Sequence, residues 1–287
     1  MPVIVGVPRS GTTLLRMMID AHAAVAIPPE TGFLPALADL DPASGSSHAA
    51  CQIITGFHTW PDFQLDPAVL RATLDRLSPA SPAEAARAFY RLYAQRHGKA
   101  RWGDKTPTYG TQLDRIASLL PEAHFIHLIR DGRDVMVSAR NLWFRPGDTI
   151  EAHAMDWAGR LARTRALGAG VSHYLEIRYE ALVTFPERTL QEVCRFLDLT
   201  FEPRMLAYHA RSAERLAEHQ ARYDPDGRLL VSKADRLRNQ WLVMEPPRPD
   251  RIGRWKAELT EDEVLRFEAA AGEWLERLGY GTRSRPV

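Results

Sequence analysis

The stretch "VPRSGTTLLRMM", from Val7 to Met18, follows directly on the apolar run from Pro2 to Gly6. An apolar strand-like run, a turn with glycine and a helix-like run together are typical of a loop that holds a phosphate. The spacing of Gly6 and Gly11 fits the common nucleotide signature GxxxxGK, but Thr12 stands where that signature has its lysine. The sequence therefore predicts an anion site that lacks the lysine used to bridge the β- and γ-phosphates.

Composition restricts the class of protein before any further motif is considered. The chain has 287 residues, 45% of them apolar and 25% charged, which fits an ordinary globular protein with a core of normal size. The net charge of +1 argues against bulk attraction to nucleic acid or to an anionic membrane. No apolar run is long enough to span a membrane. The two cysteines, Cys51 and Cys194, are too few for a disulfide framework, so we expect a cytoplasmic protein.

Strand-like and helix-like segments alternate along most of the chain, which predicts an open parallel sheet with helices on both faces. We interpret residues 1–287 as one P-loop-like α/β domain with inserted loops. The segment 41–66 shows no clear period and is expected to be loop-rich, and 204–250 to be helix plus ordered loop. The expected strands are Val3–Val7, Val25–Ile27, Arg101–Asp104, His124–Ile129 and His173–Ile177. The expected helices are Thr12–His22, Pro67–Leu77, Pro82–His97, Tyr109–Leu120, Asp131 to about Trp143, Thr149–Leu167, Pro186–Leu197 and Glu261–Leu278.

The first loop offers several donors to an anion. Its backbone N–H groups converge where Gly11 allows a tight turn, and the hydroxyls of Ser10, Thr12 and Thr13 can add to them. Arg9 contributes a charged fork. A purely structural strand-turn-helix corner is the alternative.

A second motif, "HFIHLIRDGRDVMVSARN", places Arg130 and Arg133 at the end of another buried strand, with Ser138 two turns into the next helix. Ligands of open α/β sheets bind at this edge. Arg130 and Ser138 therefore predict a second anion site beside the first. In the alternative interpretation, Arg130 and Arg133 only pair with Asp131 and Asp134 at the helix start.

Together the two motifs resemble those of the sulfotransferase superfamily, whose donor is 3′-phosphoadenosine 5′-phosphosulfate (PAPS). "PRSGTTLLR" looks like the loop for the 5′-phosphosulfate, and "LIRDGRDVMVSARN" looks like the 3′-phosphate motif, in which an arginine and a serine spaced as Arg130 and Ser138 grip the phosphate. The resemblance implies PAPS as donor, 3′-phosphoadenosine 5′-phosphate (PAP) as product, and no metal.

Further stretches are similar to the tyrosylprotein sulfotransferase branch and its bacterial relatives. "PPETGF" matches the position of a catalytic glutamate and implies Glu30, and "WGDKTPTY" matches a lysine and implies Lys105. "IRYEALVTFPERTL" implies Tyr179 as a donor contact, "GRWKAELT" implies Arg254, and a looser match implies Ser232. The resemblance covers most of residues 1–200 and 251–281.

One departure from that branch concerns the acceptor. The tyrosylprotein enzymes have an arginine after their glutamate–threonine pair, whereas this chain has Gly32. Those enzymes are also membrane-anchored, and this sequence shows no anchor. A hydroxyl of a small molecule is therefore the expected acceptor, ahead of a peptide tyrosine.

Sulfuryl transfer needs a base for the acceptor proton and a cation at the leaving phosphate. We expect Glu30 to be the base, since two prolines stiffen its loop, and Lys105 to be the cation, because a compact ammonium can follow the bridging oxygen. His127 is the rival base, but it alternates with apolar residues inside a strand and is expected to be a core histidine. Asp104 could orient Lys105 or pair with it. His153, His173, His209 and His219 are interpreted as structural or surface residues.

The segments 36–98 and 204–250 lie outside the resemblance and are expected to form the acceptor pocket and a lid. Their aromatic side chains would suit an apolar or phenolic alcohol, or could equally be local core; they are Phe57, Trp60, Phe63, Tyr208, Tyr223 and Trp241. Two other functions compete with a sulfotransferase: a small-molecule kinase, which would need Mg²⁺, and a donor-binding module without catalysis. The sequence leaves the assembly state open, a homodimer included.

Overall fold

A four-stranded parallel sheet forms the centre of the protein. The structure, a computed structural model, describes residues 1–41, 47–77, 81–140, 142, 147–224 and 226–283. The strand order is β4 (Asp104–Lys105), β1 (Pro2–Val5), β5 (His124–Ile129) and β6 (Tyr174–Arg178), with every neighbouring pair parallel. The predicted parallel sheet is confirmed, and the two strongest apolar runs, β1 and β5, are its inner strands.

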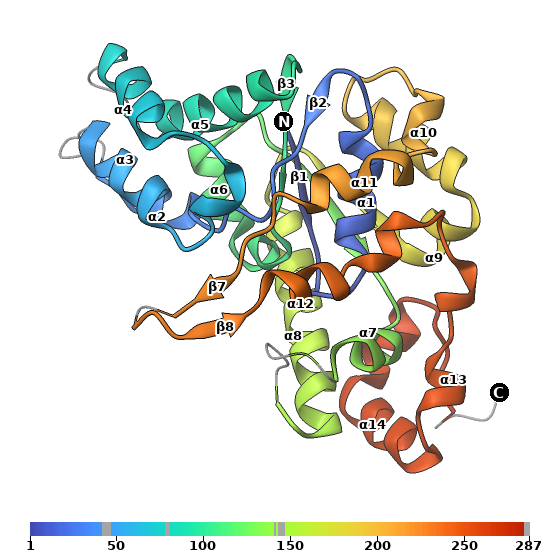
Figure 1. Ribbon diagram of the computed structural model, residues 1–287. Helices are drawn as coiled ribbons and strands as arrows, with labels where there is room; N and C mark the ends of the chain where they lie inside the picture. Colours follow the sequence, from blue (N-terminus) through green and yellow to red (C-terminus); the bar gives the residue numbers. More distant parts are fainter. Residues whose placement is uncertain (42–46, 78–80, 141, 143–146, 225, 284–287) are drawn as a thin grey trace.

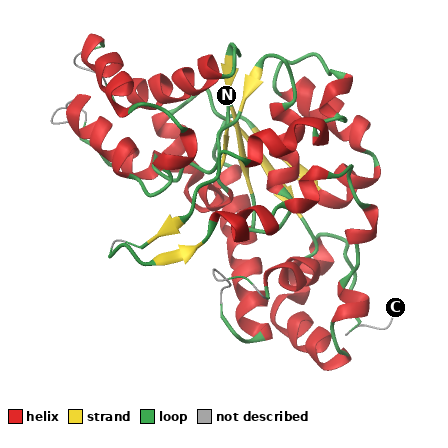
Figure 2. Cartoon of the chain, in the orientation of Figure 1, coloured by secondary structure: helices red, strands yellow, loops and turns green. Residues whose placement is uncertain are grey.

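Helices cover both faces of this sheet, as Figure 2 shows. Alternate side chains of a strand point to opposite faces, so Val3 and Val5 pack with α5 (Pro82–Arg96) and α6 (Leu113–Leu119). Ile4 and its neighbours on β5 pack on the other face, against three helices: α1 (Thr12–Asp20), α9 (Tyr179–Thr184) and α10 (Pro186–Phe196). The apolar runs therefore fix a layered α/β domain whose strand ends face one common edge.

A third apolar cluster lies beyond the carboxyl ends of β1 and β5. It is formed by α7 (Gly132–Ala139), α8 (Ile150–Gly168), α13 (Trp255–Glu258) and α14 (Glu261–Arg277), which gather near the C-terminus in Figure 1. The helix expected to run to Trp143 ends at Ala139, and Trp143 itself lies outside the described residues.

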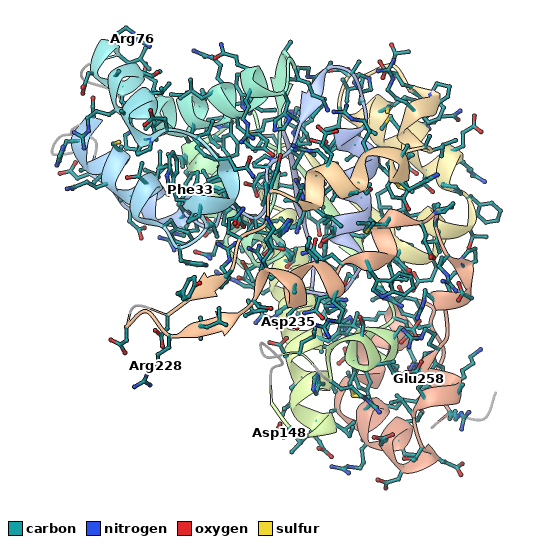
Figure 3. The ribbon with its side chains drawn as sticks, in the orientation of Figure 1. Phe33, Arg76, Asp148, Arg228, Asp235 and Glu258 are labelled. Carbon is teal, nitrogen blue, oxygen red and sulfur yellow. The ribbon has the colours of Figure 1, made fainter. Side chains whose placement is uncertain are left out.

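The prediction of a loop-rich segment 41–66 is wrong for its described part. It contains α3 (Ser47–Gly56) and the short 3-10 helix η1 (Trp60–Phe63). Ala50, Cys51 and Ile54 form one buried helical face, a period hidden among polar and glycine residues. With α2 (Leu34–Ala38), α4 (Pro67–Arg76) and α5, they build a helical lobe around the T-shaped contacts of Phe33, labelled in Figure 3.

The expected strand Arg101–Asp104 is divided in two. β3 (Arg101–Trp102) pairs with β2 (Val25–Ala26), whereas β4 pairs with β1. Gly103 separates them, and a Cβ on this residue would lie 2.7 Å from the ring of Pro2. The chain therefore passes from the two-stranded sheet to the central sheet at a glycine. A similar change occurs at the helix expected over Tyr109–Leu120, where η2 (Pro107–Gln112) precedes α6.

The segment 204–250 holds a hairpin that the sequence analysis missed. β7 (Arg222–Tyr223) and β8 (Leu229–Val231) are antiparallel and project from the body in Figure 1, with Arg228 near the tip in Figure 3. The Asp226-Gly227 pair, with Gly227 at φ 80°, is a turn signal that could have indicated it. The rest comprises η3 (Pro203–Met205), α11 (His209–Leu216), α12 (Lys233–Arg238), η4 (Trp241–Met244) and η5 (Pro249–Arg251).

A buried ion-pair cluster fastens α11 to the sheet layer. Arg215 donates to both carboxylate oxygens of Asp20, at 2.9 and 3.1 Å, and to the hydroxyl of Tyr93 at 2.7 Å. It also pairs with Glu218, and Lys99 lies 3.8 Å from Asp20. Since Asp20 is the last residue of α1, the cluster joins α11 to the helix that follows the first loop. None of the described helices is long and apolar enough to cross a membrane.

Candidate functional site

A cavity of about 930 Å³ opens where the strands of the central sheet end. The loop after β1, Arg130 after β5 and Tyr179 after β6 line one side of it. Residues 56–59 and parts of 208–251 line the rest of it, and the carbonyls of Asn239 and Arg251 accept from Arg9 and Arg130. The parallel strands thus bring to one place the residues that the two sequence motifs singled out.

The first loop has the backbone of an anion site. Arg9 and Gly11 both adopt left-handed conformations, with φ 75° and 96°. A Cβ on Gly11 would lie 2.5 Å from the ring of Tyr179, so only glycine fits here. α1 starts at Thr12 without a side-chain cap, which leaves the N–H groups of its first turn for a ligand. Within the described part of the chain, the buried Ser10 hydroxyl also has no hydrogen-bond partner.

The two predicted anion sites adjoin each other. The Nε of Arg9 donates to Ser138 Oγ at 3.1 Å, and Nη1 of Arg130 donates to the carbonyl of Arg9 at 3.2 Å. Burial lowers the pKa of Arg9, and the charge of Arg130 lowers it further. Two guanidinium groups whose charges repel each other favour a bound polyanion, which would offset that repulsion.

Arg130 is held from several sides but keeps one free donor. Its Nη2 donates to the Arg251 carbonyl at 2.8 Å, the guanidinium stacks 4.2 Å from the ring centre of Tyr179, and Asp134 lies 3.8 Å away. Its Nε is buried and has no partner among the described residues. This geometry fits a guanidinium positioned for phosphate.

Arg133, by contrast, serves the fold. It pairs with Asp131 at 2.8 Å and with Glu268 at 2.7 Å. The alternative interpretation, structural pairing at the helix start, therefore applies to Arg133.

Glu30 and Lys105 meet at the cavity. The Nζ of Lys105 donates to Glu30 Oε1 at 2.5 Å and lies 3.4 Å from the hydroxyl of Thr13. Lys105 ends β4 and is 2% exposed, whereas the Glu30 side chain is 47% exposed and lines the cavity. The pair thus lies beside Thr13 of the first loop.

The two groups shift each other's ionisation. Partial desolvation in the cavity raises the pKa of Glu30, but the charge and hydrogen bond of Lys105, with smaller effects of Arg222 and Arg236, outweigh it and hold that pKa below its ordinary value. Burial lowers the pKa of Lys105, which Glu30 opposes only in part. An anion that draws Lys105 away would therefore make Glu30 a stronger base.

A buried network holds the backbone beside Glu30. The Thr31 hydroxyl donates to Asp104 at 2.6 Å, and Tyr90 donates to the same carboxylate at 2.7 Å. Tyr109 lies 2.8 Å from the Thr31 hydroxyl. Asp104 thus orients the glutamate loop through Thr31, whereas the sequence analysis had considered it only as a partner of Lys105.

The cavity lining also contains residues that sequence reasoning missed. Arg222 and Arg236 both line the cavity and share the buried carboxylate of Asp62, at 2.7 and 2.9 Å. His219, expected to be structural or at the surface, lines it as well; burial and the charge of Arg236 hold its pKa well below the ordinary value. Asp62 is 160 residues from Arg222 and 174 from Arg236, so no local spacing indicated this contact.

Only three of the six aromatic residues line the cavity. Phe57, Tyr208 and Tyr223 line the cavity, whereas Trp60 and Phe63 belong to the core of the helical lobe. Trp241 is 42% exposed and is not among the lining residues.

Three other candidate residues lie away from the cavity. The Ser232 hydroxyl caps α12 and donates to Asp235 at 2.7 Å, and Arg254 pairs with Glu258 at 2.5 Å. Arg251, three residues earlier than Arg254, lines the cavity instead. His127 is 1% exposed within β5 and bonds to the Tyr174 hydroxyl at 2.6 Å, as a core histidine does. The described residues contain no group of His, Cys, Asp and Glu arranged to hold a metal ion.

Comparison with curated proteins finds relatives over almost the whole chain. The nodulation protein NoeE of Sinorhizobium fredii is 27% identical over 96% of this chain and 65% of its own length. Protein-tyrosine sulfotransferase 1 of Danio rerio is 27% identical over 98% of this chain and 72% of its own length. The chain therefore spans about two thirds of the length of these relatives.

Solved structures share the fold. The sulfotransferase domain of the Synechococcus PCC 7002 olefin synthase superposes with a TM-score of 0.60 at 26% identity, covering 94% of each chain. Mouse sulfotransferase SULT7A1, solved as a complex with PAP, superposes with a TM-score of 0.52 at 16% identity, over 98% of this chain and 85% of its own. The model of the family described as "Sulfotransferase family" matches residues 3–203. The chain belongs to the sulfotransferase family of enzymes.

Proposed function

We propose that this sulfotransferase moves the sulfuryl group of PAPS to a hydroxyl group of a small molecule and releases PAP. The acceptor oxygen forms a bond to sulfur while the bond from sulfur to the 5′-phosphate oxygen breaks. The acceptor proton goes to Glu30, and Lys105 stabilises the charge that builds on the leaving phosphate. No metal takes part in the proposal, since cationic side chains surround the site.

The contact between Glu30 and Lys105 carries this proposal. A carboxylate and an ammonium 2.5 Å apart, with the ammonium beside Thr13 of the first loop, lie where an acceptor and a phosphosulfate would meet. When the donor attracts Lys105, the carboxylate is released to accept a proton. Among the cavity-lining residues, Glu30 is the carboxylate next to the first loop, and His127 lies outside the cavity.

The donor would extend along the other side of the cavity. Arg9, Ser10, Gly11, Thr12 and Thr13 would hold the 5′-phosphosulfate through backbone N–H groups and hydroxyls.

The 3′-phosphate would lie further along the same side, at Arg130 and Ser138. The Arg130 guanidinium stacks on the ring of Tyr179, which holds it in place. PAP bound to mouse SULT7A1, which shares the fold, supports this choice of donor.

The residues that follow Glu30 support a small-molecule acceptor. Gly32 gives the chain no cation after Glu30, and the ring of Phe57 lies against that glycine instead. Both cysteines are free and buried, which supports a cytoplasmic location. A protein-tyrosine sulfotransferase is among the relatives of this chain, so the assay below also includes a tyrosine peptide.

The test compares Glu30→Gln with Lys105→Met over phenols of decreasing pKa. Glu30→Gln should lower the transfer rate roughly 10²- to 10⁴-fold with PAP affinity nearly unchanged, and acidic phenols should restore part of the rate because they need little help to lose a proton. Lys105→Met should slow transfer about 10²- to 10³-fold, weaken PAP binding and gain little from acidic phenols.

Glu192→Gln, an exposed glutamate on α10, is the matched control and should behave as wild type. A tyrosine peptide belongs in the same mass-gain assay. Equal dependence of both variants on acceptor pKa would remove Glu30 from the role of base. The absence of transfer to every phenol and peptide would overturn the proposed activity.

A further inference from the structure

The cavity wall facing Glu30 contains more positive charge than its own acids neutralise. Arg222 and Arg236 are only 10% and 12% exposed, and both contact the carboxylate of Asp62, which is fully buried. The Asp62 oxygens accept from Arg222 at 2.7 Å, from Arg236 at 2.9 Å twice, and from the backbone N–H of Gln220 at 2.8 Å. One carboxylate thus balances two guanidinium groups.

The other acids of this region have partners of their own, although the charge of Glu30 also acts on Arg222. Glu30 bonds to Lys105, and the Asp224 carboxylate accepts the backbone N–H of Arg228 at 2.7 Å in the hairpin turn. Burial lowers the pKa of Arg222 to about 10, because Asp62 offsets only part of the desolvation and Arg236 adds repulsion. Burial and these arginines also lower the pKa of His58, another lining residue. The local environment therefore disfavours further cations and favours an anion.

An aromatic surface of the cavity lies beside the loop that carries Glu30. Gly32 has φ 77°, and a Cβ there would lie 2.4 Å from the ring of Phe57. The glycine therefore lets the Phe57 ring approach the backbone two residues after Glu30. Phe57 lines the cavity, and the ring of His58 lies 4.6 Å from it, centre to centre.

We infer that the acceptor is a small hydroxylated aromatic acid, whose ring lies on Phe57 and whose carboxylate pairs with Arg222 and Arg236 while its hydroxyl faces Glu30. A carboxylate in this place would balance the leftover positive charge and accept charge-assisted hydrogen bonds from two buried guanidinium groups. This inference rests on the proposed function, because it assigns the acceptor end of the same site.

The test uses two phenols that differ only in charge, 4-hydroxyphenylacetate and 4-hydroxyphenylacetamide. Calorimetry on the protein saturated with PAP gives their dissociation constants, and transfer from PAPS gives their KM values. We expect the acid to bind roughly 10- to 100-fold more tightly than the amide, the range of a charge-assisted contact. Dividing the two constants within one variant cancels any loss of folded protein.

Substitutions that change the charge of the site in opposite directions separate recognition of the carboxylate from structural damage. Arg236→Gln and Arg222→Gln each remove a positive charge and should bring the acid-to-amide preference close to one. Asp62→Asn removes the negative charge and should increase that preference. Arg248 also lines the cavity but is paired with Glu245 and Asp250, so Arg248→Gln is the matched control and should leave the preference unchanged.

Three results would overturn the inference: equal binding of acid and amide, a shift of the preference in the same direction for Arg236→Gln and Asp62→Asn, or binding of neither phenol. The proposed function has a separate outcome. Transfer from PAPS without acid preference would leave the activity intact and remove the anion subsite. Acid preference in calorimetry without transfer to any acceptor would do the opposite.

Discussion

Replacing Arg130 by methionine tests whether this side chain binds the 3′-phosphate of PAP. In the structure, Arg130 Nη1 and Nη2 donate to backbone carbonyls of Arg9 and Arg251, while the buried Nε has no partner among the described residues. One charge-assisted bond from Nε to a phosphate is worth about 1.5–3 kcal/mol, or about 10- to 150-fold in affinity. Arg130→Met should therefore weaken PAP binding by at least that factor.

Adenosine 5′-phosphate, which lacks the 3′-phosphate, should lose much less. Ser138→Ala removes a neutral hydroxyl and should reduce PAP affinity only about 2- to 10-fold. The variant Arg130→Met also deprives Asp134 of its cation, although Asp134 keeps the N–H groups of Gly253 and Trp255 at 2.8 and 3.0 Å. Its stability should fall by about 1–3 kcal/mol, which thermal unfolding would record.

Calorimetry of both nucleotides on each variant gives the deciding ratio, PAP affinity over adenosine 5′-phosphate affinity. Arg133→Met, which removes a neighbouring arginine paired with Asp131 and Glu268, should destabilise the protein but leave the ratio at the wild-type value. If Arg130→Met weakens both nucleotides equally, the 3′-phosphate does not lie at Arg130 and the assignment is refuted.

Two further changes probe the first loop and the buried ion pairs. Gly11→Ala places a Cβ 2.5 Å from the Tyr179 ring at φ 96°, so PAP affinity should fall at least tenfold; wild-type affinity in calorimetry would exclude the loop as the 5′-phosphate site. Asp20→Asn should cost about 3–5 kcal/mol at pH 7, because Arg215 loses a buried partner. Burial raises the pKa of Asp20, but Arg215, Lys99 and Arg16 outweigh it and hold that pKa below its ordinary value. The ion pair's contribution is therefore complete above about pH 4 and disappears as the pH falls through the depressed value. Thermal unfolding between pH 7 and 2 should show a flatter acid limb for Asp20→Asn than for wild type, and equal slopes would contradict this reasoning.

The sheet was predictable because buried parallel strands appear in the sequence as continuous apolar runs. Val3–Val7 and His124–Ile129 both showed this pattern, and each preceded a basic loop. The meeting of the two sequence motifs at the cavity followed from the same logic, since strand ends of a parallel sheet share one edge. Arg9, Arg130, Ser138 and Tyr179 meet there.

The cavity residues around Asp62 were not predictable in the same way. Asp62 contacts Arg222 and Arg236 across more than 150 residues, and no local period encodes a contact of that separation. The helix α3 was missed because the stretches on either side of it are rich in polar residues, proline and glycine, which hid the period of its buried residues Ala50, Cys51 and Ile54. The place of Arg254 before a tryptophan implied a contact with the donor. In the structure Arg254 follows Gly253, which has φ 72°, and pairs with Glu258. Arg251 lines the cavity instead.

The ion pair between Asp20 and Arg215 limits how the segment 204–250 can be exchanged for that of a relative. α1 is nine residues long, begins directly after Gly11 of the first loop and ends at Asp20, so one short helix joins the first loop at its start to α11 at its end. A chimera that imports a segment in place of 204–250 without an arginine at position 215 leaves the Asp20 carboxylate buried without this partner. Redesign of acceptor specificity should therefore keep α11 native and confine substitutions to the hairpin and the residues that follow it.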